Sequence, residues 1–230
     1  MLSDGADFID VGGYSSRSGA EDISEVEELN RIIPVIKSIQ KSFPETIIAI
    51  DTFRSEAARQ AIEEGAAMVN DISAGSLDKK MLGMVGQAGV PYIIMHMRGT
   101  PQTMNQHTDY ENLIKDLIDY FHKKIFKAQE AGIKDIIIDP GFGFAKTVQQ
   151  NFELLRQLNH FEILGKPLLV GLSRKSMIWK TLAVSADEAL NGTTAMNTFA
   201  LMQGASILRV HDVKEAVECI KLIQEINLSK

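Results

Sequence analysis

The chain repeats one pattern seven times, in which a short apolar run ends on a polar or charged residue and a segment with helical spacing follows. The apolar runs lie at residues 8–9, 47–50, 68–69, 92–95, 136–138, 168–172 and 206–208. Short apolar runs that alternate with helical segments are typical of the buried parallel strands of an α/β fold. The repeat therefore predicts a sheet of parallel strands covered by helices.

A (β/α)8 barrel is the arrangement that this repeat favours, because its strands share one rim at their carboxyl ends and that rim holds the active site. The 230 residues fit a single barrel domain spanning 1–230, close to the usual length of about 250 residues. Seven strands are one too few, and the chain opens like the end of a helix with Gly5 as its cap. We therefore expect the first strand and most of the first helix to lie upstream of Met1.

Composition narrows the classes of function. A net charge of −6 argues against a nucleic-acid-binding surface, and no basic stretch indicates contact with a membrane. No apolar run approaches the roughly 18 residues of a membrane span, so a cytoplasmic location is expected. The single cysteine, Cys219, lies among apolar residues and is expected to be a core thiol. No cluster of cysteine and histidine residues predicts a zinc site.

The most distinctive segment, residues 139–144, begins with Asp139 and reads Asp-Pro-Gly-Phe-Gly-Phe. It lacks the third glycine of a dinucleotide-binding motif and the Lys-Ser/Thr pair of a phosphate loop. Glycines on both sides of Phe142 permit turns that place aromatic rings beside the Asp139 carboxylate. Such a site suits a planar heterocycle whose amino and ring N–H groups face the carboxylate. The alternative is a tight turn whose phenylalanines belong to the core.

Asp51 and Asn70 end neighbouring runs and are candidates for the same array, because asparagine offers both a donor and an acceptor to a ring edge. Buried carboxylates need a cationic or donor-rich partner. The alternative is that both residues only cap the helices that follow. Met95 and His96 end the next run, where Met95 suits packing on a bound ring and His96 is either a site residue or a core histidine.

Basic residues follow the last two runs. Lys175 can donate to a ring oxygen or nitrogen, whereas Arg174 is equally consistent with a structural ion pair. Arg209 and His211 alternate along the expected last strand and should point the same way. With Arg17 in the loop after the first run, they suit a phosphate or diphosphate group.

In order and over essentially the whole chain, these segments closely resemble the dihydropteroate synthase family. The segments are Asp51-Thr52, Asn70-Asp71-Ile72, Met95-His96-Met97, residues 139–144, residues 173–176 and residues 209–212. Enzymes of this family are transferases of folate biosynthesis and the targets of sulfonamide drugs. They join 4-aminobenzoate to 6-hydroxymethyl-7,8-dihydropterin diphosphate and release pyrophosphate.

The resemblance implies a site with three parts. The pterin-binding residues would be Asp51, Asn70, Met95, Asp139, Phe144, Ser173 and Lys175. The diphosphate-binding residues would be Arg17, Arg209 and His211. The aminobenzoate site would be bordered by Ser16, Arg17, Phe144, Lys175 and Ser176. The catalytic residues would be Asp139, Lys175, Arg209 and His211.

The resemblance also implies a homodimer that uses Mg²⁺ with the diphosphate. In the family, the first strand ends in an asparagine-containing loop that binds the metal, and no segment before Gly5 matches it. We therefore expect no metal ligand within this chain. A second departure lies in residues 16–19, where Ser18 stands at a position usually occupied by proline, a residue that fixes φ.

The implied chemistry agrees with the residues. Loss of pyrophosphate leaves positive charge on the pterin methylene, which Asp139 is placed to stabilise, while Arg209, His211 and Mg²⁺ would stabilise the leaving group. The neutral aromatic amine carries its own nucleophilic lone pair, so no activated side chain is required. Two alternatives remain: a pterin-binding methyltransferase domain on the same barrel, and a non-catalytic pterin-binding remnant.

Overall fold

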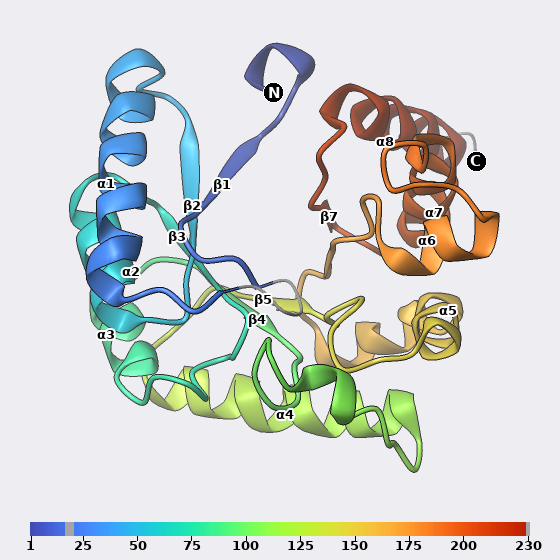
Figure 1. Ribbon diagram of the computed structural model, residues 1–230, viewed down its shortest axis with the longest axis horizontal. Coiled ribbons are helices and arrows are strands. Elements are labelled where there is room, and N and C mark those ends of the chain that lie inside the picture. The colour runs from blue at the N-terminus through green and yellow to red at the C-terminus, as the bar shows by residue number, and fades with distance from the viewer. Residues whose placement is uncertain (17–20, 229–230) are drawn as a thin grey trace.

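The computed structural model describes residues 1–16 and 21–228, and it shows an α/β fold whose strands are all parallel (Figure 1). Each of the seven apolar runs forms a strand within this part of the chain. The strands are β1 (Phe8–Gly12), β2 (Ile47–Asp51), β3 (Met68–Asp71), β4 (Tyr92–Met95), β5 (Ile136–Asp139), β6 (Leu169–Val170) and β7 (Ile207–Leu208).

Helices follow the strands, as the repeat predicts. They are α1 (Glu25–Ser42), α2 (Ser55–Glu63), α3 (Met81–Ala88), α4 (Leu113–Glu130), α5 (Val148–Arg156), α6 (Ser176–Leu182), α7 (Leu190–Met202) and α8 (Val213–Leu228). Short 3-10 segments lie at Leu2–Asp4, Met104–Gln106 and Leu158–Leu164. The first of these ends at Gly5 with a left-handed φ of 100°, so the expected helix end at the start of the chain is confirmed. None of the described helices is both long and apolar enough to cross a membrane.

The strands form one curved layer with two faces. β1 to β5 pair in chain order, β6 pairs with β7, and a single bridge between Ile138 and Leu168 joins the two groups. Successive side chains point to opposite faces. One set, including Ile48, Ile50 and Val69, packs with the helices in the main core, and Cys219 is also buried, as expected. The other set forms a separate inner cluster of Ala49, Met68, Ile93, Ile137 and Leu169.

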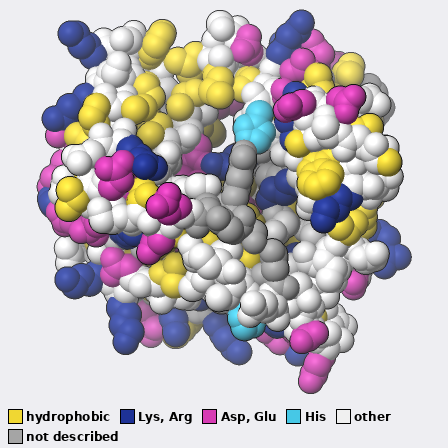
Figure 2. Space-filling model, viewed as in Figure 1, with side chains coloured by type: hydrophobic (Ala, Val, Ile, Leu, Met, Phe, Trp, Pro, Cys, Tyr) yellow, Lys and Arg dark blue, Asp and Glu magenta, His cyan; other side chains and the backbone are white. Residues whose placement is uncertain are grey.

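The layer has two edges, β1 and β7, and no strand ladder joins them among the described residues. In Figure 1 the helices lie outside the curved layer, with α1 to α3 beside β1 to β3 and α6 to α8 beside β7. In the space-filling view the surface is hollowed between these two groups of helices (Figure 2). The expectation of a further strand upstream stays a prediction.

A buried ion pair ties α1 to the start of α2. The Glu28 side chain is fully buried, and its Oε2 accepts a 2.6 Å hydrogen bond from Arg54 Nη1, while Oε1 has no partner among the described residues. Arg54 also donates to the carbonyl of Ile23. A carboxylate in such a position needs its cation, because an unpaired buried charge is costly.

We expect Arg54→Met to lower the free energy of unfolding by about 3 kcal/mol, because it leaves the Glu28 carboxylate buried without a partner. Arg59→Met is the matched control, since Arg59 pairs only with the exposed Glu56 and Glu63 and should change stability by less than about 1 kcal/mol. Urea denaturation followed by circular dichroism measures both. Equal losses in the two variants would contradict the assigned importance of the buried pair.

Candidate active site

Five side chains meet at the carboxyl end of the inner face. In the strand register, Asp51 on β2 lies opposite Asn70 on β3, and Asp139 on β5 lies opposite Met95 on β4. Asp10 on β1 lies opposite Ala49 of the inner cluster and therefore shares that face. Because side chains alternate with a period of two, these residues all point inward at or near the rim. The structure thus brings together the predicted Asp51, Asn70, Met95 and Asp139.

Arg209, which follows β7 at one edge of the layer, forms ion pairs with carboxylates on β1 and β2 at the other edge. Its Nε lies 2.5 Å from Asp10 Oδ2, and its Nη2 lies 3.1 Å from Asp51 Oδ2. Asn70 Nδ2 donates to the same Asp10 oxygen at 3.1 Å, while Asp10 Oδ1 is buried without a described partner. The sequence places Asp10 at the end of the first run, as it places Asp51 at the end of the second, but it did not show that Asp10 pairs with Arg209 and Asn70.

The Asp51 carboxyl lies in an environment that disfavours its charge. Burial raises its pKa, and repulsion from the Asp10 carboxylate raises it further, while Arg209 acts in the opposite direction. The alternative that Asp51 and Asn70 only cap helices is wrong: the N-cap residues are Arg54 for α2 and Lys80 for α3, and the first N–H of α2 donates to Asp78, not to Asp51 or Asn70. Both residues are instead held in the inner array.

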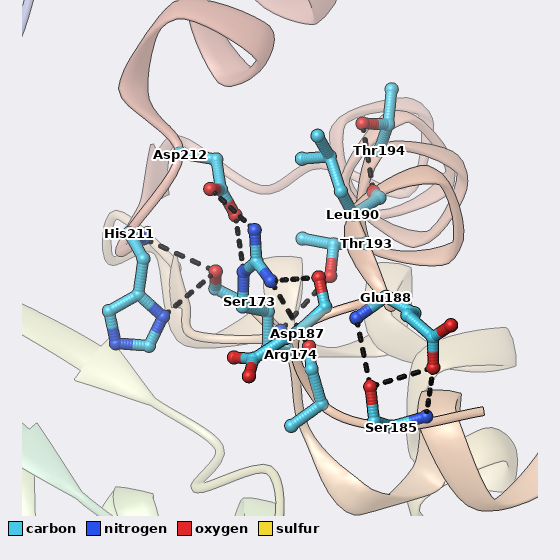
Figure 3. Close-up of polar contacts among 11 residues, drawn as sticks. Ser173, Arg174, Ser185, Asp187, Glu188, Leu190, Thr193, Thr194, His211 and Asp212 are labelled. Atoms are coloured by element: carbon cyan, nitrogen blue, oxygen red, sulfur yellow. Dashed lines mark hydrogen bonds and ion pairs between the residues drawn. The ribbon is translucent and has the colours of Figure 1, made fainter.

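The expected alignment of Arg209 with His211 needs correction. β7 ends at Leu208, so the strand alternation that predicted a shared direction does not extend to these residues. Arg209 faces the carboxylates of the first two strands, whereas the backbone N–H and Nδ1 of His211 both lie 3.2 Å from Ser173 Oγ (Figure 3). Arg17, the third predicted diphosphate residue, lies outside the described residues. Ser16 is described and half-buried.

Arg174 has the structural role that the sequence left open. Its Nε and Nη2 each lie 2.9 Å from an oxygen of Asp212, and it also donates to the carbonyls of Ala186 and Asp187 (Figure 3). Its φ of 51° places it in the left-handed region. The ion pair thereby fixes the turn from which Lys175 and the first residue of α6, Ser176, follow.

Lys175 lies between the loop after β5 and the Asp139 carboxylate. Its Nζ donates to the carbonyl of Phe142 and lies 5.1 Å from the centre of the Phe144 ring. Burial lowers the pKa of Lys175 to about 8, against the favourable field of Asp139. Burial likewise raises the pKa of Asp139, against Lys175 and a 2.8 Å hydrogen bond from Gly141 N–H. Lys175 is therefore mostly protonated at neutral pH and offers a cation beside a carboxylate.

The sequence left open whether the two phenylalanines of the loop after β5 line a binding site or belong to the core, and the structure shows one of each kind. Phe142 is fully buried in the main core, as the tight-turn alternative expected. Phe144 is only partly buried and packs on a separate cluster that includes Met95 and Met97. Met95 at the end of β4 and Ser173 in the segment after β6 are both buried. A planar group on the inner face would therefore meet one phenylalanine ring and one methionine.

The structure contains a buried lysine, Lys146, that the sequence analysis did not predict. Its contacts also decide the role of His96, which the sequence left open. Lys146 is 7% exposed, and its Nζ lies 3.1 Å from His96 Nδ1, 3.0 Å from Gly141 O and 3.1 Å from Phe144 O. Burial lowers the pKa of Lys146 to about 7 and holds the pKa of His96 well below its usual range. His96 is thus a core histidine. Lys146 follows the aromatic motif in sequence, but nothing in its spacing signalled a buried ammonium.

The carboxylates of the inner rim are the residues that could hold a magnesium ion. Among the described residues no group of three Asp, Glu, His or Cys side chains is placed to hold a metal ion. Asp10 and Asp51 lie close together, but both already pair with Arg209. These residues do not fit a protein-held Mg²⁺ site, and no step of the chemistry below depends on one.

The chain is similar to proteins of a known family. A family model described as "Pterin binding enzyme" matches residues 1–211. A dihydropteroate synthase of Synechocystis is 46% identical over 225 residues, which cover 96% of this chain and 78% of that protein. The Yersinia pestis dihydropteroate synthase in a sulfonamide drug complex has a TM-score of 0.95 at 37% identity, with 99% of this chain and 83% of that chain covered.

A further solved structure is the Clostridium difficile dihydropteroate synthase in the presence of pteroic acid, with a TM-score of 0.92 and 37% identity over 98% of this chain and 84% of that chain. The fold and the polar inner rim, together with these matches, place the chain among the pterin binding enzymes. Within them it belongs to the dihydropteroate synthase family of transferases, and its fold is the barrel of that family.

The lowered pKa of Lys146 makes a prediction about stability and pH. The ammonium is penalised only in the folded chain, so Lys146 contributes most above the unfolded pKa near 10.5, and its contribution falls as the pH drops toward about 7. From pH 10 down to pH 7, the unchanged chain should lose up to about 4 kcal/mol of unfolding free energy relative to Lys146→Met.

Urea titrations across this pH range measure the difference between the two chains. Lys123→Met is the control, because Lys123 is exposed on α4 and its ammonium stays in contact with water in the folded chain. A constant difference for Lys146→Met over the whole range would show that Lys146 keeps an ordinary pKa.

Proposed function

We propose that the chain catalyses the condensation of 4-aminobenzoate with 6-hydroxymethyl-7,8-dihydropterin diphosphate, with release of pyrophosphate, as a step of folate biosynthesis. The observation that carries this proposal is the convergence of Asp51, Asn70, Asp139 and Lys175 on the inner rim, next to the Phe144 ring. Similarity to a synthase solved with pteroic acid, a molecule that joins a pterin to 4-aminobenzoate, supports the same choice.

In this proposal the pterin lies flat between Met95 and Phe144 with its polar edge toward the strand ends. Asp139 accepts hydrogen bonds from ring N–H and amino groups. Burial raises the pKa of Asp139, and the donors of the bound ring would favour its charged form. Asn70 supplies a donor and an acceptor, and Lys175 donates to a ring oxygen or nitrogen. Asp51 and Ser173 complete the pterin contacts.

The diphosphate would lie toward Arg209, His211 and Arg17. Arg209 is 48% exposed, and its two described bonds to Asp10 and Asp51 use two of the five N–H donors of a guanidinium. The remaining donors can bind phosphate oxygens without breaking the inner network. The aminobenzoate would then lie near Ser16, Arg17, Phe144, Lys175 and Ser176, on the exposed side of the aromatic slot.

The chemistry needs few protein groups. The bond between the pterin methylene and the diphosphate oxygen breaks, and its electron pair leaves with pyrophosphate. The amine lone pair of 4-aminobenzoate forms the new carbon–nitrogen bond, and the nitrogen then loses a proton. Asp139 stabilises positive charge on the pterin, and Arg209 and His211 stabilise the negative charge of the leaving group. These three residues, with Lys175 orienting the ring, form the proposed catalytic set.

We further propose that the chain forms a homodimer and is a target of sulfonamide drugs. α7 and α8 pack against each other and expose the large apolar side chains of Phe199, Met202, Leu222 and Ile226, a composition that suits a protein interface. Sedimentation equilibrium should therefore give the mass of two chains, and a monomer at micromolar concentration would refute the dimer. The cytoplasmic location and the single 1–230 domain stay predictions of the sequence.

The reaction is tested by mixing pterin diphosphate with 4-aminobenzoate and measuring released pyrophosphate. We expect Asp139→Asn to lower kcat/KM by about 100-fold, because the amide turns an N–H toward the ring donors where a buried charged acceptor stood. Asp119→Asn is the control, since Asp119 is exposed on α4 and pairs with Lys115, and it should retain full activity.

The outcome also separates the alternatives. Pteroic acid binding without any pyrophosphate release from the unchanged chain would favour the methyltransferase domain or the non-catalytic remnant, and methyl transfer from a methylated pterin would distinguish those two. Undiminished activity of Asp139→Asn would remove Asp139 from the proposed catalytic set.

A further inference from the structure

The loop that carries Phe144 has a backbone that cannot hold its shape unaided. Gly141, Gly143 and Ala145 all lie in the left-handed region, with φ values of 71°, 79° and 50°. Ala145 has a Cβ and is therefore strained there. A Cβ at Gly141 would lie 2.2 Å from the carbonyl oxygen of His96, so the loop runs in direct contact with the end of β4. Such a backbone persists only when surrounding groups fix it.

Lys146 supplies three of the fixing contacts from inside the protein. Its Nζ meets the carbonyl oxygens of Gly141 and Phe144 and the Nδ1 of His96, at 3.0 to 3.1 Å. An ammonium group has three N–H donors, and three acceptors are present. Nδ1 can accept only in a neutral imidazole, which agrees with the burial of His96. The other charged groups that act on Lys146 are Asp139, Lys175 and Arg98, at longer range.

We infer that Lys146 is a positioning residue for the pterin slot, acting through the loop 141–145 and not by touching the substrate. It fixes the carbonyl of Phe144, whose ring forms the slot, and by closing the loop it sets the Phe142 carbonyl that accepts from Lys175 Nζ. Through His96 it also ties the loop to β4, which carries Met95. The inference rests on the proposed pterin-binding function.

Two other side chains hold the same loop from its outer side. Asn151 Oδ1 accepts from Gly143 N–H at 2.7 Å, and the Tyr110 hydroxyl donates to the Ala145 carbonyl at 2.9 Å. These contacts preserve the fold of the loop when Lys146 is replaced. Loss of the ammonium should therefore displace the Phe144 ring without unfolding the chain.

The first experiment compares Lys146→Met with Lys124→Met. Lys124 is a matched control because its ammonium likewise donates to a loop carbonyl, that of Ala74, and to Ser76, in a loop that carries none of the proposed site residues. Hydrogen exchange of the peptide spanning 141–146, measured without ligand, should accelerate in Lys146→Met and stay unchanged in Lys124→Met. The Phe144 amide, which donates to Gly141 O, is the specific reporter.

The second experiment measures the affinity for pteroic acid by calorimetry. Lys146→Met should weaken binding about tenfold, and Lys124→Met should not weaken it. Phe144→Ala should also weaken binding, and adding Lys146→Met to Phe144→Ala should weaken binding by clearly less than tenfold, because part of the effect of the lysine runs through that ring. A general loss of stability would not produce this coupling.

Unchanged pteroic acid affinity in Lys146→Met, or full addition of the two effects in the double variant, would overturn the inference. If Lys146→Met does not fold, Lys146→Gln replaces it, since its amide keeps a polar end but cannot reach all three acceptors. Failure of the unchanged chain to bind pteroic acid would instead overturn the proposed function, and the exchange rates would then still decide whether Lys146 holds the loop.

Discussion

Arg209 reaches from the end of β7 to the carboxylates of Asp10 on β1 and Asp51 on β2, and the rest of the inner rim depends on this one cation. Carboxylates on one sheet face repel each other and resist burial. Arg209 pairs with both carboxylates and offsets one of their two charges, and Asn70 adds a donor to the same Asp10 oxygen. The array can therefore stay ionised enough to hold a donor-rich ligand while the strands beneath it remain apolar.

A second cation performs the same task on the opposite side. Burial raises the pKa of Asp139 and lowers the pKa of Lys175, and the charge of each group reduces the shift of the other. Lys175 reaches this place because Arg174 is fixed by Asp212 in a left-handed turn. The two halves of the rim thus pair acids with bases across strands that are far apart in the sequence, as suits a ligand with a donor-rich ring at one end and a diphosphate at the other.

Several features could be predicted from the sequence for a clear physical reason. Strand alternation is a local property, and the repeat of strand and helix favours parallel pairing, so the apolar runs, their inward residues and the shared rim all followed from residue order. Asp51, Asn70, Met95 and Asp139 were placed on that basis. The predicted direction of the His211 side chain was wrong, because β7 ends at Leu208 and strand alternation does not extend to His211. His211 instead contacts Ser173, which no periodicity in the sequence could have shown.

The sequence by itself determined which residues end the strands and therefore which side chains line the inner rim, because a period of two leaves little freedom once strands pair in parallel. Only the tertiary structure decided which charged groups pair with one another. Asp10 acquired its role from Arg209, 199 residues away, and Lys146 became a buried ammonium because two loop carbonyls and His96 close around it. Partners distant in the chain leave no local pattern, since only the folded backbone sets the distances that decide an electrostatic interaction.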